Sequence, residues 1–159
     1  MKENREWTPR ILCLLCRWCA YAGADLAGIS RIHYPPTPRV IRFPCSARMD
    51  PYFVIKGFRE GFDGVLVAGC HPGDCHYSKG NYYARRRFML LKDLLLFAGI
   101  EPERLQIRWI SAAEGKKFAQ VISEMTEKIL PLGPLKIKEI SLKRILEKEE
   151  LWQPLAGSE

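Results

Sequence analysis

The sequence predicts an α/β protein: a small flavodoxin-like, doubly wound parallel sheet of about four strands, with an appended C-terminal helix. Three observations lead to this prediction. Short apolar or alternating segments typical of strands recur along the chain, and segments with the apolar spacing of helices lie between them. The third observation is length, because 159 residues are enough for one domain with a sizeable core.

Four strands are expected. The clearest is 64–68, an apolar run bounded by glycines, which predicts a strand buried on both faces. The segment 39–44 alternates and stops at a proline, and 105–110 alternates as well, while 10–15 is a short apolar run. Strands of this length separated by helices form parallel sheets with helices on both faces.

Helices are expected between and after these strands. The first, 20–28, is rich in small residues, and the second, 52–60, begins after Asp50 as N-cap and ends at Gly61. Asn81 is expected to cap the third helix, which ends at Gly99. Apolar stripes mark the buried faces of this helix and of a fourth one, which begins with capping-box spacing at 111–114: Phe88, Leu91, Leu95 and Ala98, and then Phe118, Val121, Ile122, Met125 and Ile129.

The chain is expected to divide after residue 132. Residues 1–132 form the main domain, and 133–159 form a linker followed by a helix rich in lysine and glutamate. Packing of this helix against the domain and contact with a partner protein are both open interpretations.

Composition excludes several classes of protein. No apolar run approaches the ~20 residues of a membrane-spanning helix, and the apolar run 11–15 is too short for a secretory signal, so we expect a cytoplasmic protein. The net charge is +7, but the basic residues are scattered apart from one cluster at 85–87. Because no nucleic-acid-binding signature accompanies them, no nucleic acid partner is expected. A P-loop, a hydrolytic triad and a Gly-x-Gly-x-x-Gly motif are also absent from the sequence.

Five of the six cysteines follow the ends of predicted strands. Cys16 and Cys19 follow the first strand, Cys45 follows the second, and Cys70 and Cys75 follow the third. Because parallel strands bring their carboxyl ends to one edge of the sheet, three distant loops should converge there. Clustered cysteines in a reducing compartment indicate metal or redox chemistry. The sixth cysteine, Cys13, lies inside a strand and is expected to be a small buried hydrophobe.

Several kinds of thiolate chemistry remain open on these residues alone. Four thiolates can hold an iron–sulfur cluster. A zinc-stabilised binding module is an alternative, although only Cys16 and Cys19 have the tight spacing of a zinc knuckle. The same pair, after a strand and before a helix, also has the placement of a thiol–disulfide oxidoreductase. His71 and His76 are either ligands or, as we favour, hydrogen-bond a sulfur or face a partner.

An ordered series of motifs resembles the delta subunit of methyl-viologen-reducing [NiFe] hydrogenase. The resemblance covers about residues 11–132 and is carried by these segments: Cys16-Arg17-Trp18-Cys19-Ala20-Tyr21, Tyr34-Pro35-Pro36, Cys45-Ser46, Arg48, Asp50-Pro51, Gly69-Cys70-His71-Pro72-Gly73-Asp74-Cys75-His76-Tyr77, the segment 99–105, and Trp109-Ile110-Ser111-Ala112. The resemblance implies a non-catalytic iron–sulfur electron carrier. Its expected partners are the hydrogenase small subunit, or a formate dehydrogenase, and the flavin-containing subunit of heterodisulfide reductase in a cytoplasmic complex.

The resemblance also implies a [2Fe–2S] cluster. The family motif carries five cysteines for four ligand positions, matched here by Cys16, Cys19, Cys45, Cys70 and Cys75. We expect the last three of these, together with one of Cys16 and Cys19, to be the ligands. Arg17 stands where the family commonly has asparagine.

Overall fold

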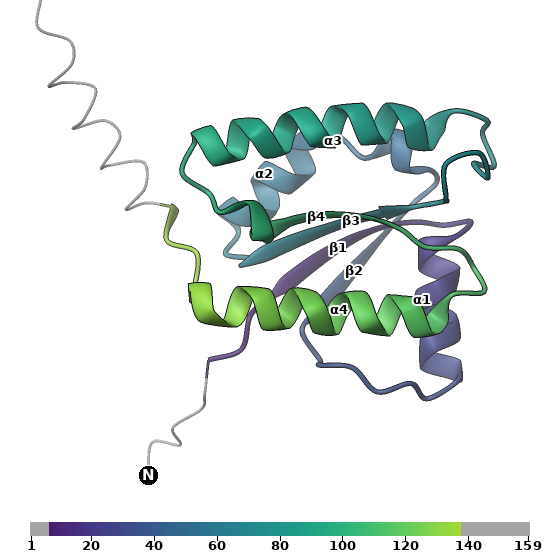
Figure 1. Ribbon diagram of the computed structural model, residues 1–159, viewed down its shortest axis with the longest axis horizontal. Coiled ribbons are helices and arrows are strands. Elements are labelled where there is room, and N and C mark those ends of the chain that lie inside the picture. Colours follow the sequence, from purple (N-terminus) through teal and green to yellow (C-terminus); the bar gives the residue numbers. More distant parts are fainter. Residues whose placement is uncertain (1–6, 138–159) are drawn as a thin grey trace, which may run out of the picture.

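The computed structural model describes residues 7–137, which fold around a four-stranded, all-parallel sheet (Figure 1). The strands are β1 (Ile11–Cys16), β2 (Pro38–Phe43), β3 (Gly64–Gly69) and β4 (Leu105–Trp109). Their spatial order is β2-β1-β3-β4, which is the order of the first four strands of the flavodoxin-like arrangement. The predicted α/β class and the four parallel strands are confirmed.

The helices cover both faces of the sheet. They are α1 (Ala20–Ile29), α2 (Pro51–Arg59), α3 (Gly80–Phe97) and α4 (Gly115–Ile129). One core cluster joins the sheet to α2 and α3, and a second joins the other face to α1 and α4 (Figure 1). The helix predicted beyond residue 133 falls almost entirely on 138–159, outside the described residues. Between residues 7 and 137, no helix is both long and apolar enough to cross a membrane.

Strand position in the sheet follows from the residue pattern. Every residue of β1 and β3 is buried, as expected for continuous apolar runs at the centre of a parallel sheet. In contrast, β2 lies at the edge and exposes Val40 and Ile41. The structure extends β1 by one residue beyond the predicted end, to Cys16, because that residue pairs with Phe43 of β2.

Helix ends confirm some of the predicted caps and correct others. The Asp50 carboxylate accepts the Tyr52 N–H at 2.8 Å, and Gly61 closes the end of α2 with φ +83°. The prediction that Asn81 caps α3 is wrong, because the helix begins at Gly80 and Asn81 is its second residue. The predicted capping box at 111–114 does not start α4, because the helix begins at Gly115; the Glu114 carboxylate instead accepts the Ser111 N–H at 2.7 Å within the preceding turn.

Two buried polar residues hold the first and last segments of the described chain at the amino edge of the sheet. One Asp63 carboxylate oxygen accepts the Arg10 N–H at 2.9 Å and the other accepts the Leu135 N–H at 3.1 Å. The guanidinium of Arg104, only 1% exposed, donates to the carbonyls of Asp63 and Gly133, both at 3.0 Å. Its Nε donates to the Glu101 carboxylate at 2.6 Å. The polar side-chain groups of Asp63 and Arg104 at this edge are therefore all paired with other described residues.

Candidate metal centre

The five motif cysteines all lie at the carboxyl edge of the sheet. Cys16 is the last residue of β1, and Cys19 precedes α1 as its N-cap. Cys45 follows β2 and precedes the short 3-10 helix η1 (Ser46–Arg48), while Cys70 directly follows β3. Cys75 lies in the loop that leads to α3. All five side chains are buried, and none of the chain's cysteines is in a disulfide.

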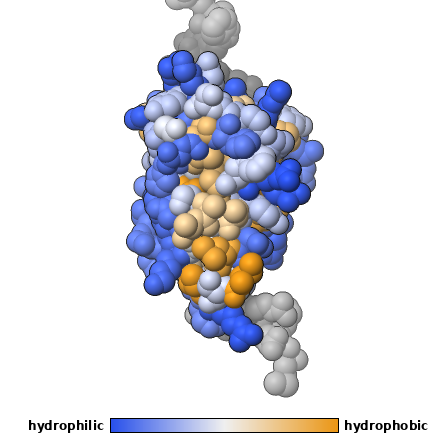
Figure 2. All heavy atoms as spheres, turned by 90° about the vertical axis from the view of Figure 1, so that its right-hand side faces the viewer, coloured by the Kyte–Doolittle hydropathy of each residue, from blue (hydrophilic) through white to orange (hydrophobic). Residues whose placement is uncertain are grey.

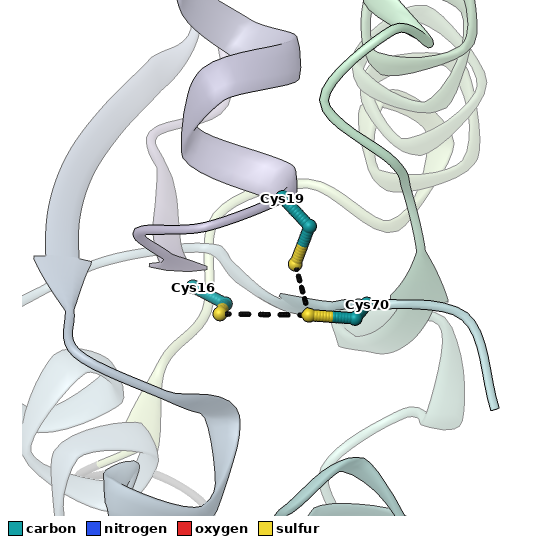
Figure 3. Close-up of side chains that lie close together, drawn as sticks. All are labelled: Cys16, Cys19 and Cys70. Carbon is teal, nitrogen blue, oxygen red and sulfur yellow. Dashed lines mark hydrogen bonds between the residues drawn. The ribbon is translucent and has the colours of Figure 1, made fainter. Parts of the chain in front are cut away.

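Three of these thiols form a tight cluster. The Sγ atoms of Cys19 and Cys70 are 2.7 Å apart, and those of Cys16 and Cys70 are 3.9 Å apart (Figure 3). All three Sγ atoms lie within 4.8 Å of one another. Thiol groups 51 and 54 residues apart in sequence therefore meet at one point, as the strand–loop pattern predicts.

The other two thiols form a pair beside the amino end of α3. The Sγ atoms of Cys45 and Cys75 are 3.9 Å apart. A Cβ placed on Gly80 would lie 2.5 Å from the Cys45 sulfur and 3.1 Å from that of Cys75, so this position has room only for glycine. The amino end of a helix favours negative charge nearby, which suits a pair of thiolates.

The sheet topology explains why the thiols gather here. After β1 the chain crosses to β2, which lies on one side of the central pair β1 and β3. After β3 it crosses to β4, which lies on the other side of this pair. The carboxyl ends of β1 and β3 therefore flank the point where the strand order reverses. In open parallel sheets, ligands bind in the crevice at this point. Cys16 ends the first of these strands and Cys70 directly follows the second, so the three-thiol cluster occupies the expected binding position of the fold.

Backbone N–H groups near the sulfurs favour the ionised thiols. Hydrogen bonds from the N–H groups of Trp18 and Ser46 contribute to the lowered pKa of Cys16. The Ala47 N–H acts in the same direction on the pKa of Cys45, and the His76 N–H does so on the pKa of Cys70. Such donors stabilise negative charge on sulfur, which is what a thiolate-bound metal centre requires.

The thiols restrain one another from ionising together. Hydrogen bonds from Cys19 and Cys70 lower the pKa of Cys16 to about 3. The hydrogen bond with Cys16 raises the pKa of Cys19 well above its usual range, and the one between Cys16 and Cys70 raises the pKa of Cys70 to about 11. Ionisation of one thiol therefore disfavours ionisation of its neighbours, and a bound cation would relieve this repulsion. This donor set fits a metal ion or an iron–sulfur cluster.

An unsatisfied hydroxyl lies beside this cluster. Among the described residues, Ser46 Oγ is the buried side-chain polar atom that has no hydrogen-bond partner. It faces the end of β3, because a Cβ placed on Gly69 would lie 2.9 Å from it. A buried hydroxyl without a partner is costly, so a group that accepts its hydrogen bond would be stabilising.

The remaining cysteine lies apart from the thiols, whereas His71 and His76 line a cavity together with Cys19 and Cys70 but contact other side chains. Cys13 packs in the core cluster on the opposite face of the sheet, and burial raises its pKa, so its prediction as a buried hydrophobe is confirmed. The His71 ring nitrogen Nε2 lies 2.7 Å from the Glu114 carboxylate, and the His76 ring stacks on Trp18 at 4.0 Å. These contacts favour the interpretation in which neither histidine is a metal ligand.

Sequence reasoning did not identify three residues that build the site. Asn81 donates from its side-chain amide to the carbonyls of Cys70 and His71, and thereby fixes the loop that carries the thiols. Ser46 and Gly80 are the other two. The signal for Asn81 was a polar side chain at the start of a helix, but its partners lie ten and eleven residues away in a loop of irregular shape.

A parallel α/β sheet with five buried thiols at its carboxyl edge defines a small protein with a thiolate-rich candidate metal centre. The chain belongs to the family described as methyl-viologen-reducing hydrogenase, delta subunit, whose family model matches residues 11–133. The resemblance drawn from the motifs is thereby confirmed.

Individual relatives fall into two groups. The iron-sulfur subunit of the F420-non-reducing hydrogenase of Archaeoglobus profundus is 53% identical over 135 residues, which are 85% of this chain and 98% of the relative. The vhu iron-sulfur subunit of Methanocaldococcus jannaschii is 39% identical over 130 residues, or 82% of this chain and 97% of the relative. The second group includes a subunit of the Ferredoxin:CoB-CoM heterodisulfide reductase of Methanosarcina mazei, 49% identical over 132 residues, which are 83% of this chain but 17% of that protein.

Proposed function

We propose that this chain is an electron-transfer subunit that holds a [2Fe–2S] cluster. It would relay electrons between a hydrogenase, or a formate dehydrogenase, and the flavin-containing subunit of heterodisulfide reductase. The convergence of five buried thiols from three loops is the observation that carries the proposal. The names of the relatives support it, since one is an iron–sulfur subunit of a hydrogenase and another belongs to a heterodisulfide reductase.

The proposed ligands are Cys45, Cys70, Cys75 and one of Cys16 and Cys19. Both of these thiols lie in one cluster with Cys70, so either could complete the set. A bound cluster supplies one-electron redox chemistry. The chain's own contribution is to exclude water from the buried thiols and to direct N–H groups at them, which favours the more negative, reduced state.

The carboxyl edge of the sheet also offers a surface for partners. Trp18 and Tyr77 lie beside the thiols, are 43% and 54% exposed, and are joined by a hydrogen bond from Trp18 Nε1 to the Tyr77 hydroxyl. Figure 2 shows an apolar strip that runs down this side of the molecule over α1, where Leu26 and Ile29 are exposed. Partners that dock on this edge would come close to the thiols, which supports a relay role.

Substitution of single cysteines tests the proposal. In the anaerobically purified complex, we expect Cys70→Ser or Cys75→Ser to remove iron and visible absorption and to stop electron transfer to heterodisulfide reductase. The hydrogenase should still reduce an artificial dye. Cys13→Ser is the matched control and should keep the iron, because Cys13 lies on the other face of the sheet. Full electron transfer in both variants would contradict the assignment.

Metal analysis separates this proposal from the two alternatives. Cys16, Cys19 and Cys70 could also hold zinc with one further ligand. A colourless protein that contains zinc would favour a zinc-stabilised binding module. A metal-free protein that reduces disulfides through Cys16 and Cys19 would favour a thiol–disulfide oxidoreductase. The expected result is iron and inorganic sulfide in equal amounts, with two irons per chain for a [2Fe–2S] cluster. The cytoplasmic location stays a prediction.

A further inference from the structure

The carboxyl edge carries one thiol more than four ligand positions use. Two sulfur–sulfur distances there are 3.9 Å, one between Cys16 and Cys70 and the other between Cys45 and Cys75. Two thiolates on one tetrahedral metal ion lie about 3.8 Å apart, because each bond is about 2.3 Å long. These two pairs therefore have the spacing that the two irons of the proposed cluster require, and Cys19 is left as the fifth thiol.

Cys19 approaches Cys70 at a different distance. Their Sγ atoms are 2.7 Å apart, the shortest separation among the six cysteines. Figure 3 shows that the Cys16 and Cys19 sulfurs reach that of Cys70 from the end of β1 and from the start of α1. The separation of 2.7 Å is too short for two thiolates on one metal ion. In a disulfide the sulfur atoms are about 2.05 Å apart, so a movement of less than about 1 Å would convert this contact into a bond.

A cavity gives small molecules access to this pair. Its volume is about 250 Å³, and among the described residues its lining includes Cys19 and Cys70 but not Cys16. Trp18, which is 43% exposed, also lines the cavity, so the cavity is connected to solvent. A small oxidant can therefore reach the two closest thiols of the chain although both side chains are buried.

The pair of Cys45 and Cys75 is the alternative site of oxidation. Cys45 lines a second cavity, of about 520 Å³, but its sulfur is 3.9 Å from that of Cys75. A disulfide between these two thiols requires a movement more than twice as large as the one between Cys19 and Cys70. Distance therefore favours oxidation in the three-thiol cluster.

We propose that Cys19 and Cys70 form a disulfide in the cluster-free chain, and that this bond withholds Cys70 from the ligand set until a dithiol reductant opens it. The second half of the proposal rests on the proposed function. Because Cys70 is then held as a disulfide, which a thiol can reverse, it is protected from irreversible oxidation before a cluster is inserted.

The oxidant is a peroxide. One thiol of the pair attacks the O–O bond, becomes a sulfenic acid and releases one water. The other thiol attacks the sulfur of the sulfenic acid, which forms the S–S bond and releases a second water. Both thiol protons leave in water, and two electrons pass from the sulfurs to the peroxide. A dithiol reverses the step by exchange, and leaves as its own disulfide while both cysteines regain their protons.

Peptide mapping of the full chain tests the disulfide. The anaerobically purified chain is stripped of metal with a chelator and treated with an equimolar amount of hydrogen peroxide, and the remaining thiols are blocked with N-ethylmaleimide. Trypsin cuts after Arg17, which puts Cys16 and Cys19 on different peptides, and fragment ions separate Cys70 from Cys75. We expect the link between Cys19 and Cys70 to be about tenfold more abundant than any other. A different main link, or no link, would overturn the proposal.

Two serine variants separate the fifth thiol from the ligands. Cys19→Ser should abolish the link but keep about two irons per chain after anaerobic reconstitution, whereas Cys16→Ser should keep the link and lose the iron. Iron analysis and visible absorption measure this difference. Loss of iron from Cys19→Ser would contradict the proposal, because it would make Cys19 a ligand.

Iron uptake by the wild-type chain tests the second half of the proposal. Treatment with peroxide before reconstitution should lower the uptake about tenfold, and dithiothreitol should restore it. Uptake that the peroxide does not change would show that the bond withholds no ligand. If the untreated wild-type chain takes up no iron, the proposed function fails instead, and the peptide map still decides whether Cys19 and Cys70 form the disulfide.

Discussion

At the amino edge of the sheet, Arg104 and Asp63 are buried and each of their polar groups has a partner within the chain. At the carboxyl edge, the thiols of Cys16, Cys19 and Cys70 contact mainly one another, and Ser46 Oγ has no partner among the described residues. Both edges are buried and both belong to the same four strands. The difference separates an edge whose polar side chains are paired within the described chain from one whose thiols and hydroxyl could bind the proposed cluster.

The largest expected effect on stability follows from removal of the amino-edge guanidinium. Arg104→Met should lower the free energy of unfolding by about 3–5 kcal/mol, because it leaves the carbonyls of Asp63, Leu132 and Gly133 without their donor. Chemical denaturation measures this loss. Arg59→Met, an exposed arginine at the end of α2, should cost less than about 0.5 kcal/mol. If the folded fraction of Arg104→Met also loses its iron, the two edges are not independent.

The second effect concerns the carboxyl edge. Gly80→Ala should remove most of the bound iron, because its Cβ would fill the space beside the sulfurs of Cys45 and Cys75, and should destabilise the fold by only about 1–3 kcal/mol. Iron per chain and denaturation measure the two quantities. Gly28→Ala in α1 is the control: nothing lies within 4 Å of its added Cβ, so it should keep the iron and be slightly more stable. Full iron content in Gly80→Ala would show that the pair does not hold the group.

A smaller effect is expected at the start of α4. The Ser111 N–H and the His71 ring lower the pKa of Glu114 to about 2 from its ordinary 4.5. The carboxylate therefore stabilises the folded state fully at pH values above the ordinary pKa of 4.5. Glu114→Gln should cost about 1 kcal/mol at pH 7. The difference from the wild type should shrink as the pH falls from about 4.5 towards 2. Urea unfolding at several pH values checks this, with the exposed Glu127→Gln showing no such trend.

The smallest effect on stability, and the sharpest probe of the carboxyl edge, is expected for Ser46. Ser46→Ala should leave the unfolding free energy almost unchanged, because the hydroxyl has no partner within the described chain. If the hydroxyl donates to a bound cluster, its loss should lower the reduction potential by roughly 20–60 mV, since the donor favours the more negative state. A redox titration followed by electron paramagnetic resonance measures the potential. An unchanged potential would remove Ser46 from the site.

Most of the fold and the location of the site follow from periodicity. The parallel direction of the strands and the position of Cys16, Cys45 and Cys70 at one edge need only the alternation of strands and helices, which the apolar pattern records directly, whereas the strand order comes from the structure. Both ends of α2 were predictable because they depend on local residues. Asp50 accepts a hydrogen bond two residues along the chain, and Gly61 adopts a positive φ directly after the helix. The bounds of β1 differed by one residue, since pairing with β2 decides where a strand ends.

Side-chain partners across the structure could not be predicted. Arginine is almost always solvated, so nothing local indicates that Arg104 is buried with partners 28 to 41 residues away. Asn81 has the residue type of a helix cap, but its amide serves the thiol-bearing loop, because α3 begins one residue earlier. The contact of His71 with Glu114 likewise joins residues 43 positions apart. Such contacts depend on the tertiary arrangement and leave no periodic trace.

The spacing of the thiols has a consequence for biosynthesis. Cys16 and Cys70 meet only because β1 pairs directly with β3, and Cys45 is brought near because β2 pairs with β1. Cys16 and Cys19 are close in sequence, but the three-thiol cluster also needs Cys70 and is complete only when β1 and β3 have paired. Insertion of the proposed cluster would therefore have to wait until β1, β2 and β3 have left the ribosome and aligned, so the assembled sheet, and not a short peptide, would receive it.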